Sequence, residues 1–173
     1  MLNHHRTGEG EKQLTDVNNL CDEYLNLSYH GMRANVPNFN CVIVKKLATN
    51  LPEINIIPQD ISRVFLNLFN NAFYAVKDKA DNQKPESDYK PTVSFTTLIH
   101  GNKVVLKVRD NGNGIPKELK EKIFEPFFTT KPAGQGTGLG LSLSYDIIKV
   151  HNGEISVESK DGEYTEFKIK LPI

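Results

Sequence analysis

The sequence predicts an α+β fold: a two-layer α/β sandwich in which helices cover one face of a mixed, mostly antiparallel sheet. Three observations predict it. Residues 60–76 form one long amphipathic helical pattern. Two pairs of strand-like segments follow each other with only a turn between them, at residues 91–110 and 155–171. Strands and helices alternate without the repeating strand–helix–strand rhythm that a parallel sheet requires.

The first third of the chain contains a polar segment, a helix and two strands. Residues 1–13 hold few apolar side chains and two glycines, which is typical of a linker or of the end of a preceding element. From Thr15 onward, Leu20, Tyr24 and Leu27 recur at helical spacing, and Gly31 is the expected end of this helix. Residues 39–47 and 51–58 are predicted strands, with Ile54 and Ile56 on one side of the pleat.

The remaining elements follow from the same patterns. The helix over residues 60–76 has one apolar stripe, made of Ile61, Val64, Phe65, Leu68, Phe69, Ala72 and Val76. Residues 77–90 are polar and charged, so we expect a loop that is prone to disorder. A turn at residues 100–102 joins two strands, a short helix is expected at residues 116–123, and Gly153 is the expected C′ residue of a helix that starts near Leu141.

Composition limits the class of protein. The 173 residues are enough for one core, which we place at residues 14–173. Lys and Arg number 21, as do Asp and Glu, so the chain lacks the basic excess of a nucleic-acid-coating protein. No apolar run is long enough to cross a bilayer and the N-terminus does not look like a signal peptide. Cys21 and Cys41 form no zinc motif, and we expect both to be reduced core residues of a cytoplasmic protein.

Two segments contain side chains suited to a nucleotide. On the long helix, Asn67, Asn71 and Tyr74 share one narrow sector, and an Asn carbonyl is a ligand that Mg²⁺ accepts beside water and phosphate oxygens. These positions could equally be merely solvated. At residues 110–116 (DNGNGIP), the carboxylate of Asp110 ends a strand and precedes glycines, an arrangement suited to an exocyclic amine such as that of adenine. The alternative interpretation is an ordinary tight turn.

Two further segments suit phosphate and a movable cover. Residues 134–141 alternate glycine with other residues and run into a helix, so free backbone N–H groups can meet phosphate there. The alternative is a flexible linker, and the pattern is neither a Walker A loop nor a dinucleotide fingerprint. Residues 123–131 hold three phenylalanines in a mobile connection, which favours a lid from which Lys131 could reach phosphate. Core packing is the alternative for Phe124.

These four segments together resemble the ATP-binding catalytic domain of bacterial sensor histidine kinases, in the superfamily that also holds DNA gyrase, heat-shock chaperone ATPases and mismatch-repair ATPases. The N box of the family is matched by residues 67–72, the G1 box by 110–114, the F box by 124–128 and the G2 box by 136–141. Order and spacing agree from about Thr15 to Ile173. The resemblance implies the Bergerat ATP-binding fold, ATP and Mg²⁺ as cofactors, and a kinase catalytic domain at residues 14–173.

The resemblance also implies roles for individual residues. Asn71 would coordinate Mg²⁺ with support from Asn67, and Asp110 would accept a hydrogen bond from the adenine amine. The complete set of expected nucleotide-binding residues is Asn67, Asn71, Asp110, Gly112, Gly114, Ile115, Phe128, Thr130, Lys131, Gly136, Thr137, Gly138, Leu139, Gly140 and Thr165.

Two departures from the family pattern, and one difference from the hydrolysing branch of the superfamily, affect these expectations. Tyr164 stands where the family has a glycine, which weakens the assignment of Thr165 near adenine. Tyr74 stands where many members have a basic residue, and Lys131 could compensate. Hydrolysing relatives have a Glu at the position of Asn67, where it activates water. The amide here favours phosphoryl transfer over hydrolysis.

The resemblance further implies partners that this chain does not contain. No histidine is followed by an acidic residue, so we expect the acceptor histidine on a separate dimerising helical domain, of which residues 1–13 could be a remnant. A response regulator receiver domain would be the second partner. The fragment is expected to be monomeric, without nucleic acid, and cytoplasmic, including as the cytoplasmic part of a membrane-anchored receptor. Three alternatives stay open: a serine kinase of the anti-sigma-factor type, a nucleotide-binding module without transfer activity, and a hydrolysing ATPase.

Overall fold

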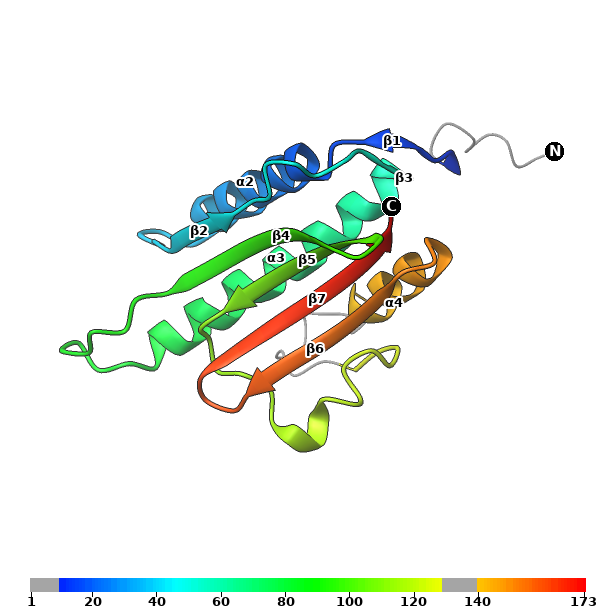
Figure 1. Cartoon of the computed structure of the whole chain (residues 1–173). Helices are drawn as coiled ribbons and strands as arrows, with labels where there is room; N and C mark the ends of the chain where they lie inside the picture. The colour runs from blue at the N-terminus through cyan, green and yellow to red at the C-terminus, as the bar shows by residue number, and fades with distance from the viewer. Residues whose placement is uncertain (1–9, 129–139) are drawn as a thin grey trace.

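The structure is a computed structural model that describes residues 10–128 and 140–173. Its main sheet has five strands in the order β2-β4-β5-β7-β6 (Figure 1). The strands are β2 (Val42–Lys46), β4 (Thr92–His100), β5 (Lys103–Asp110), β6 (Glu154–Lys160) and β7 (Tyr164–Pro172). Only the β2–β4 pair is parallel, and the other three pairs are antiparallel. The predicted mixed, mostly antiparallel sheet is confirmed.

Three helices cover one face of this sheet: α2 (Val17–Asn35), α3 (Pro58–Asp81) and α4 (Gly140–Val150) (Figure 1). All seven residues of the apolar stripe predicted on α3 are buried. They meet the inward residues of β4, β5 and β7, which alternate with outward polar residues as a half-covered antiparallel sheet requires. The aromatic rings of Phe65, Phe69 and Phe95 form the centre of this contact, with centroid separations of 5.7–6.2 Å. The two-layer sandwich is confirmed.

Both long helices extend further than the sequence predicts. Helix α2 continues through Gly31 to Asn35, because Gly31 lies on an exposed face with no atom near the position of a Cβ and needs no left-handed backbone. Helix α3 continues five residues past Val76, into the segment expected to be a loop. An ion pair between Lys77 and Asp81, four residues apart, supports this last turn.

A second, two-stranded sheet joins β1 (Gln13–Thr15) to β3 (Ile54–Ile56) in antiparallel register. Ile54 and Ile56 are buried on one side of β3, as predicted, whereas β1 lies in a segment for which the sequence predicted no element. A strand of three residues is too short for its alternation to be recognised. It forms only because it pairs with β3, which lies about forty residues away in the sequence.

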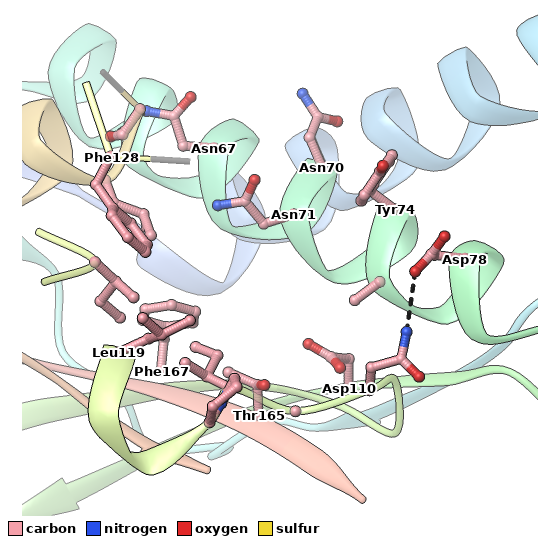
Figure 2. A pocket seen from close by; sticks show the side chains of 18 of the residues that line it. Asn67, Asn70, Asn71, Tyr74, Asp78, Asp110, Leu119, Phe128, Thr165 and Phe167 are labelled. Carbon is pink, nitrogen blue, oxygen red and sulfur yellow. Dashed lines mark hydrogen bonds between the residues drawn. The ribbon is translucent and has the colours of Figure 1, made fainter. Parts of the chain in front are cut away.

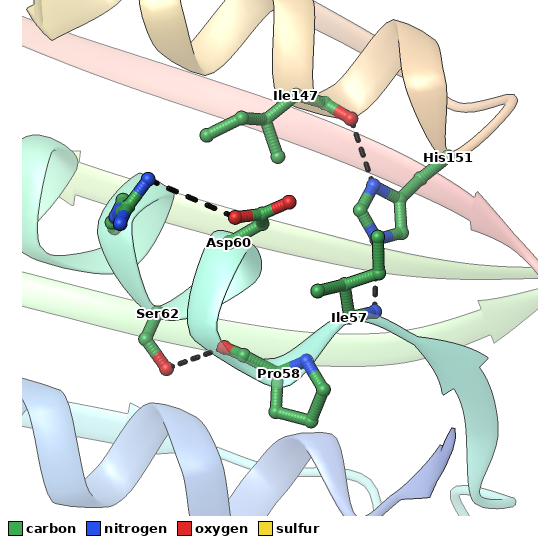
Figure 3. A network of polar contacts seen from close by, with 7 residues as sticks. Ile57, Pro58, Asp60, Ser62, Ile147 and His151 are labelled. Atoms are coloured by element: carbon green, nitrogen blue, oxygen red, sulfur yellow. Dashed lines mark hydrogen bonds and ion pairs between the residues drawn. The ribbon is translucent and has the colours of Figure 1, made fainter. Parts of the chain in front are cut away.

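The end of α4 is fixed by a Schellman motif and by a buried histidine. Asn152, not Gly153, is the left-handed C′ residue (φ 61°), so the predicted position is wrong by one. The Gly153 N–H donates to the Ile148 carbonyl at 2.9 Å, in the pattern of that motif. His151 Nε2 accepts the Ile57 N–H at 3.0 Å, and its Nδ1–H donates to the Ile147 carbonyl at 2.8 Å (Figure 3). The imidazole therefore ties α4 to the start of α3.

Of the short helix expected at residues 116–123, the structure has only the 3₁₀ helix η2 (Lys117–Leu119).

Cys21 is fully buried and Cys41 half-buried, and both thiols are free. Burial raises the pKa of both thiols, that of Cys41 to about 12, which suits core residues. Within residues 10–128 and 140–173, no helix is both long enough and apolar enough to cross a membrane.

Candidate nucleotide-binding site

A cavity of about 650 Å³ opens between α3, the segment after β5, the outer end of β7 and the start of α4 (Figure 2). It is lined by side chains that the sequence predicted and by others that it did not. Of the expected residues, the lining includes Asn67, Asn71, Asp110, Gly114, Ile115, Phe128, Gly140 and Thr165. Thr130, Lys131, Gly136, Thr137, Gly138 and Leu139 lie outside the described residues.

Helix α3 provides the polar wall of the cavity. Asn67, Asn71 and Tyr74 project from it on one side, opposite to the apolar stripe that meets the sheet (Figure 2). Asp78, which sequence reasoning missed, extends the same row. Its position, four residues after Tyr74 and seven after Asn71, is the helical spacing that could have identified it.

Asp110 lies at the other side of the cavity, at the end of β5. It is buried, with 5% of its surface exposed, and one carboxylate oxygen accepts the Gly112 N–H at 2.9 Å. Burial raises the pKa of Asp110 to about 7, against the opposing effects of this hydrogen bond and of the positive charges on Arg109 and Lys79. A buried acceptor that faces a cavity is suited to a ligand that brings a hydrogen-bond donor.

The two glycines after Asp110 allow close approaches of backbone. A Cβ at Gly112 would lie 2.7 Å from the Cβ of Ala75, so this residue lets the segment pack against α3, and it does not line the cavity. Gly114 has a φ of +73°, and a Cβ there would lie 2.2 Å from the Lys160 carbonyl oxygen. Because Gly114 has no side chain, the segment can pack against the β6–β7 turn, and room is left beside Asp110.

A hydrogen-bond network closes this end of the cavity. Asn113 Nδ2 donates to Asp78 at 3.0 Å, and the Asn113 carbonyl accepts the Gly162 N–H at 2.6 Å. Lys79 Nζ in turn donates to the Gly162 carbonyl at 2.9 Å. The network joins α3, the segment after β5 and the β6–β7 turn. The walls around Asp110 are therefore held by three elements that are distant in sequence.

The register of the sheet shows where the side chain of Tyr164 lies, the residue that stands where the family has a glycine. Thr165 lies directly opposite Asp110, is buried, and lines the cavity. Because side chains alternate along a strand, Tyr164 points to the opposite face of the sheet, where the Arg109 guanidinium lies 3.9 Å from its ring centroid. The tyrosine therefore does not fill the space beside Thr165.

The start of α4 is attached to the opposite end of the polar wall. Asn67 Nδ2 donates to the Gly140 carbonyl at 3.0 Å and to the Ser144 hydroxyl at 3.2 Å. Ser144 is fully buried and was not recognised from the sequence. The Asn67 amide thus fixes the first turn of α4 against the polar wall that α3 forms.

Apolar residues complete the cavity on the side of η2. Phe128 and Ile123 line it together with Leu119 and Phe167. Phe124 instead packs edge-on against Phe167, with ring centroids 6.2 Å apart, which supports core packing at this position. A flat apolar wall opposite a polar one is suited to a ring system that carries a charged tail.

The comparison with known proteins decides the family. The model of the family described as "Histidine kinase-, DNA gyrase B-, and HSP90-like ATPase" matches residues 56–173. The chain belongs to this ATPase family. The relationship expected from the four sequence motifs is confirmed, and membership of an ATPase family implies that the domain binds ATP.

Individual relatives of this ATPase domain are sensor kinases. The signal transduction histidine-protein kinase AtoS of Escherichia coli (strain K12) is 33% identical over 174 residues, covering 100% of this chain and 26% of AtoS. Sensor kinase CckA of Brucella abortus is 54% identical over 78 residues, covering 45% of this chain and 8% of CckA. The catalytic domain of histidine kinase ThkA has a TM-score of 0.75 and 31% identity, with 94% of this chain and 95% of that chain covered. The chain therefore spans about a quarter or less of these two sensor kinases and nearly all of a solved catalytic domain.

The polar wall of the cavity carries neutral amide oxygens that a cation could use, on Asn67, Asn70 and Asn71. Among the described residues there is no group of three or more His, Cys, Asp or Glu side chains that could hold a metal ion. Asn71 lines the cavity between Asn67 and Tyr74 and carries an amide oxygen. Mg²⁺ keeps several waters and takes phosphate oxygens readily, so one amide ligand beside a triphosphate fits this ion.

Proposed function

We propose that this chain is the ATP-binding catalytic half of a two-component sensor histidine kinase. It would transfer the γ-phosphoryl group of Mg-ATP to a histidine on a helical domain outside this chain. The observation that supports this most is the arrangement of the cavity, with the buried carboxylate of Asp110 on one side and Asn71 on the polar wall of α3, to which the start of α4 is attached through Asn67. The family match and the likeness to histidine kinase catalytic domains support the same proposal.

The two ends of the cavity have different tasks. Asp110, held by the Gly112 N–H, accepts a hydrogen bond from the adenine amine, while Thr165 and Gly114 leave space for the ring. At the other end, Asn71 is the side chain that would hold Mg²⁺, which when bound with ATP neutralises charge on the phosphate oxygens. The N-terminus of α4 presents its backbone dipole on the same side. Phosphoryl transfer depends mainly on such positioning and charge neutralisation.

The amide of Asn67 favours transfer over hydrolysis. Activation of water requires a group that accepts a proton, and an amide does not do so. The Asn67 Nδ2 group is also engaged with Gly140 and Ser144, so the side chain is committed to holding α4. The acceptor for the phosphoryl group would then be supplied by another domain.

The histidines of the described chain support an acceptor elsewhere. His151 is 3% exposed and both of its ring nitrogens are engaged in hydrogen bonds, so it cannot attack a phosphate. His30 and His100 are exposed and precede glycines. We propose a dimerising phosphoacceptor domain and a response regulator receiver domain as partners, a cytoplasmic location, and a monomeric state for this chain alone.

A transfer assay tests the proposal. Purified chain, labelled ATP and Mg²⁺ are mixed with a separately expressed helical phosphoacceptor domain of a sensor kinase relative. We expect acid-labile label on the added domain and none on this chain. Acid-labile label on this chain alone would place the acceptor within it and contradict the proposal.

Three measurements separate the alternatives. Acid-stable label on a serine of an added partner would indicate a serine kinase. The absence of any heat on calorimetric titration with ATP would indicate a module that has lost its nucleotide. Phosphate release by the chain alone at roughly one per second, near the low end of ordinary enzyme turnover, would indicate a hydrolysing ATPase.

A further inference from the structure

The face of the main sheet that the helices leave uncovered carries a cluster of lysines. Helices α2, α3 and α4 all lie on one side, and no helix of residues 10–128 and 140–173 covers the other side of β4, β5 and β7 (Figure 1). The alternation of side chains places Lys103 and Lys107 of β5 on this open face together with Lys168 and Lys170 of β7. We call these four residues the lysine patch.

The register of the two central strands brings these charges close together. Lys107 lies directly opposite Lys168, and Lys170 lies opposite Val105, which separates Lys103 from Lys107 along β5. Side chains opposite one another on antiparallel strands have Cβ atoms about 5 Å apart, and like charges in that position destabilise the pair. All four lysines are half-buried along the sheet, so their stems follow a rigid surface.

One carboxylate of the described chain lies opposite a patch lysine: Glu154 of β6 is the register partner of Lys170, whereas Lys103, Lys107 and Lys168 have no carboxylate directly opposite them. Lys45, Lys77 and Lys160 each form an ion pair, whereas no ion pair or side-chain hydrogen bond joins any of the four patch lysines, Lys170 included, to another described residue. Glu166 of β7 is directed to Arg109, with an N···O distance of 3.6 Å. The chain has equal numbers of acidic and basic residues, so this segregation reflects placement and not a general basic excess.

We propose that the lysine patch is a docking surface for an acidic segment of a partner protein. A patch of unpaired like charges is unfavourable in the free chain and becomes favourable when carboxylates approach it. The strands fix the spacing of the four ammonium groups, so a partner with carboxylates at a matching spacing gains specificity as well as attraction.

Other polyanions fit the patch less well. Its centre is Val105, which is 4% exposed, and the flanking residues opposite Lys107 and Lys168 are Thr96 and Ser156. The tyrosine of this face, Tyr164, is covered by Arg109 and offers no ring for stacking on a base. The centre of the patch likewise lacks an exposed apolar side chain of the kind that anchors peripheral proteins in a bilayer.

A charge reversal tests the proposal through two independent readouts. Lys168→Glu replaces the repulsion with an attraction to Lys107, so we expect a higher thermal midpoint of unfolding, by a few degrees. The same change should weaken binding of a short fluorescent polyglutamate peptide about tenfold at low salt. Lys84→Glu, which makes the same change of charge in the exposed segment after α3, should leave both quantities unchanged.

Each alternative outcome overturns the proposal in a recognisable way. Equal peptide binding by wild type, Lys168→Glu and Lys84→Glu would mean that the patch does not bind acidic segments. Tighter and equally Lys168-dependent binding of phosphatidylserine vesicles or of single-stranded DNA would assign the patch to a membrane or to nucleic acid. Sedimentation showing dimers of wild type that Lys168→Glu abolishes would assign it to a second copy. Unchanged ATP affinity in the variant would show that the fold is intact, so these outcomes do not depend on the kinase proposal.

Discussion

Replacing Asp110 with asparagine should stabilise the nucleotide-free chain and weaken its affinity for ATP. The carboxyl group has an ordinary pKa of 3.8, and burial raises the pKa to about 7 in the folded chain. Between these values the unfolded chain has lost the proton and the folded chain still holds it. The free energy of unfolding therefore falls as the pH rises from about 4 to about 7.

The magnitude follows from the two pKa values. Each pH unit between them is worth roughly 1.4 kcal/mol, so ionised Asp110 destabilises the folded chain by about 4 kcal/mol above pH 7. The neutral amide of D110N resembles the protonated acid and can still accept the Gly112 N–H. The variant should therefore be more stable than wild type by up to about 4 kcal/mol at pH 8, and by almost nothing near pH 4.

Two assays measure the expected gain in stability and the expected loss of ATP affinity. Urea unfolding at both pH values gives the difference in stability, and calorimetric titration with ATP and GTP gives affinity and base selectivity. Losing the charged acceptor should cost about 1–3 kcal/mol of ATP binding and reduce the preference for ATP over GTP. A stability gain of equal size at both pH values would refute the role of the buried charge. Unchanged ATP affinity would refute the assignment of Asp110 to adenine.

The remaining predictions concern pH, the cation and two glycines. Wild-type affinity for ATP should increase as the pH passes from 6 to 8, because the ionised acceptor is the binding form; calorimetry in several buffers should detect proton release. Asn71→Ala should remove the gain in ATP affinity from Mg²⁺, whereas Asn67→Ala should lower ATP affinity with and without Mg²⁺, because it releases α4. Gly31→Ala should stabilise the chain by about 1 kcal/mol in urea unfolding, since its Cβ meets no atom. Gly114→Ala should cost more than about 2 kcal/mol, because φ is +73° and the Cβ would strike a carbonyl; a loss below that value would show that the segment can relax.

The sequence by itself determined those features that depend on neighbours along the chain. The stripe on α3, the alternation in β7 and the turn after His100 are local patterns, and the structure has each of them. The asparagine sector of α3 and the carboxylate at the end of β5 were recognised in the same way. Their common use in one cavity was inferred from resemblance, since no local pattern relates residues forty positions apart.

Only the tertiary structure decided how distant segments meet. The pairing of β5 with β7 sets Thr165 opposite Asp110 and turns Tyr164 to the other face of the sheet. The presence of a tyrosine in place of the family's glycine does not by itself reveal this orientation. The same register gathers the lysine patch. The engagement of Asn67 with Ser144 likewise depends on where α4 packs. These contacts follow from the joint burial of all the apolar faces, a property of the whole core that no window of sequence contains.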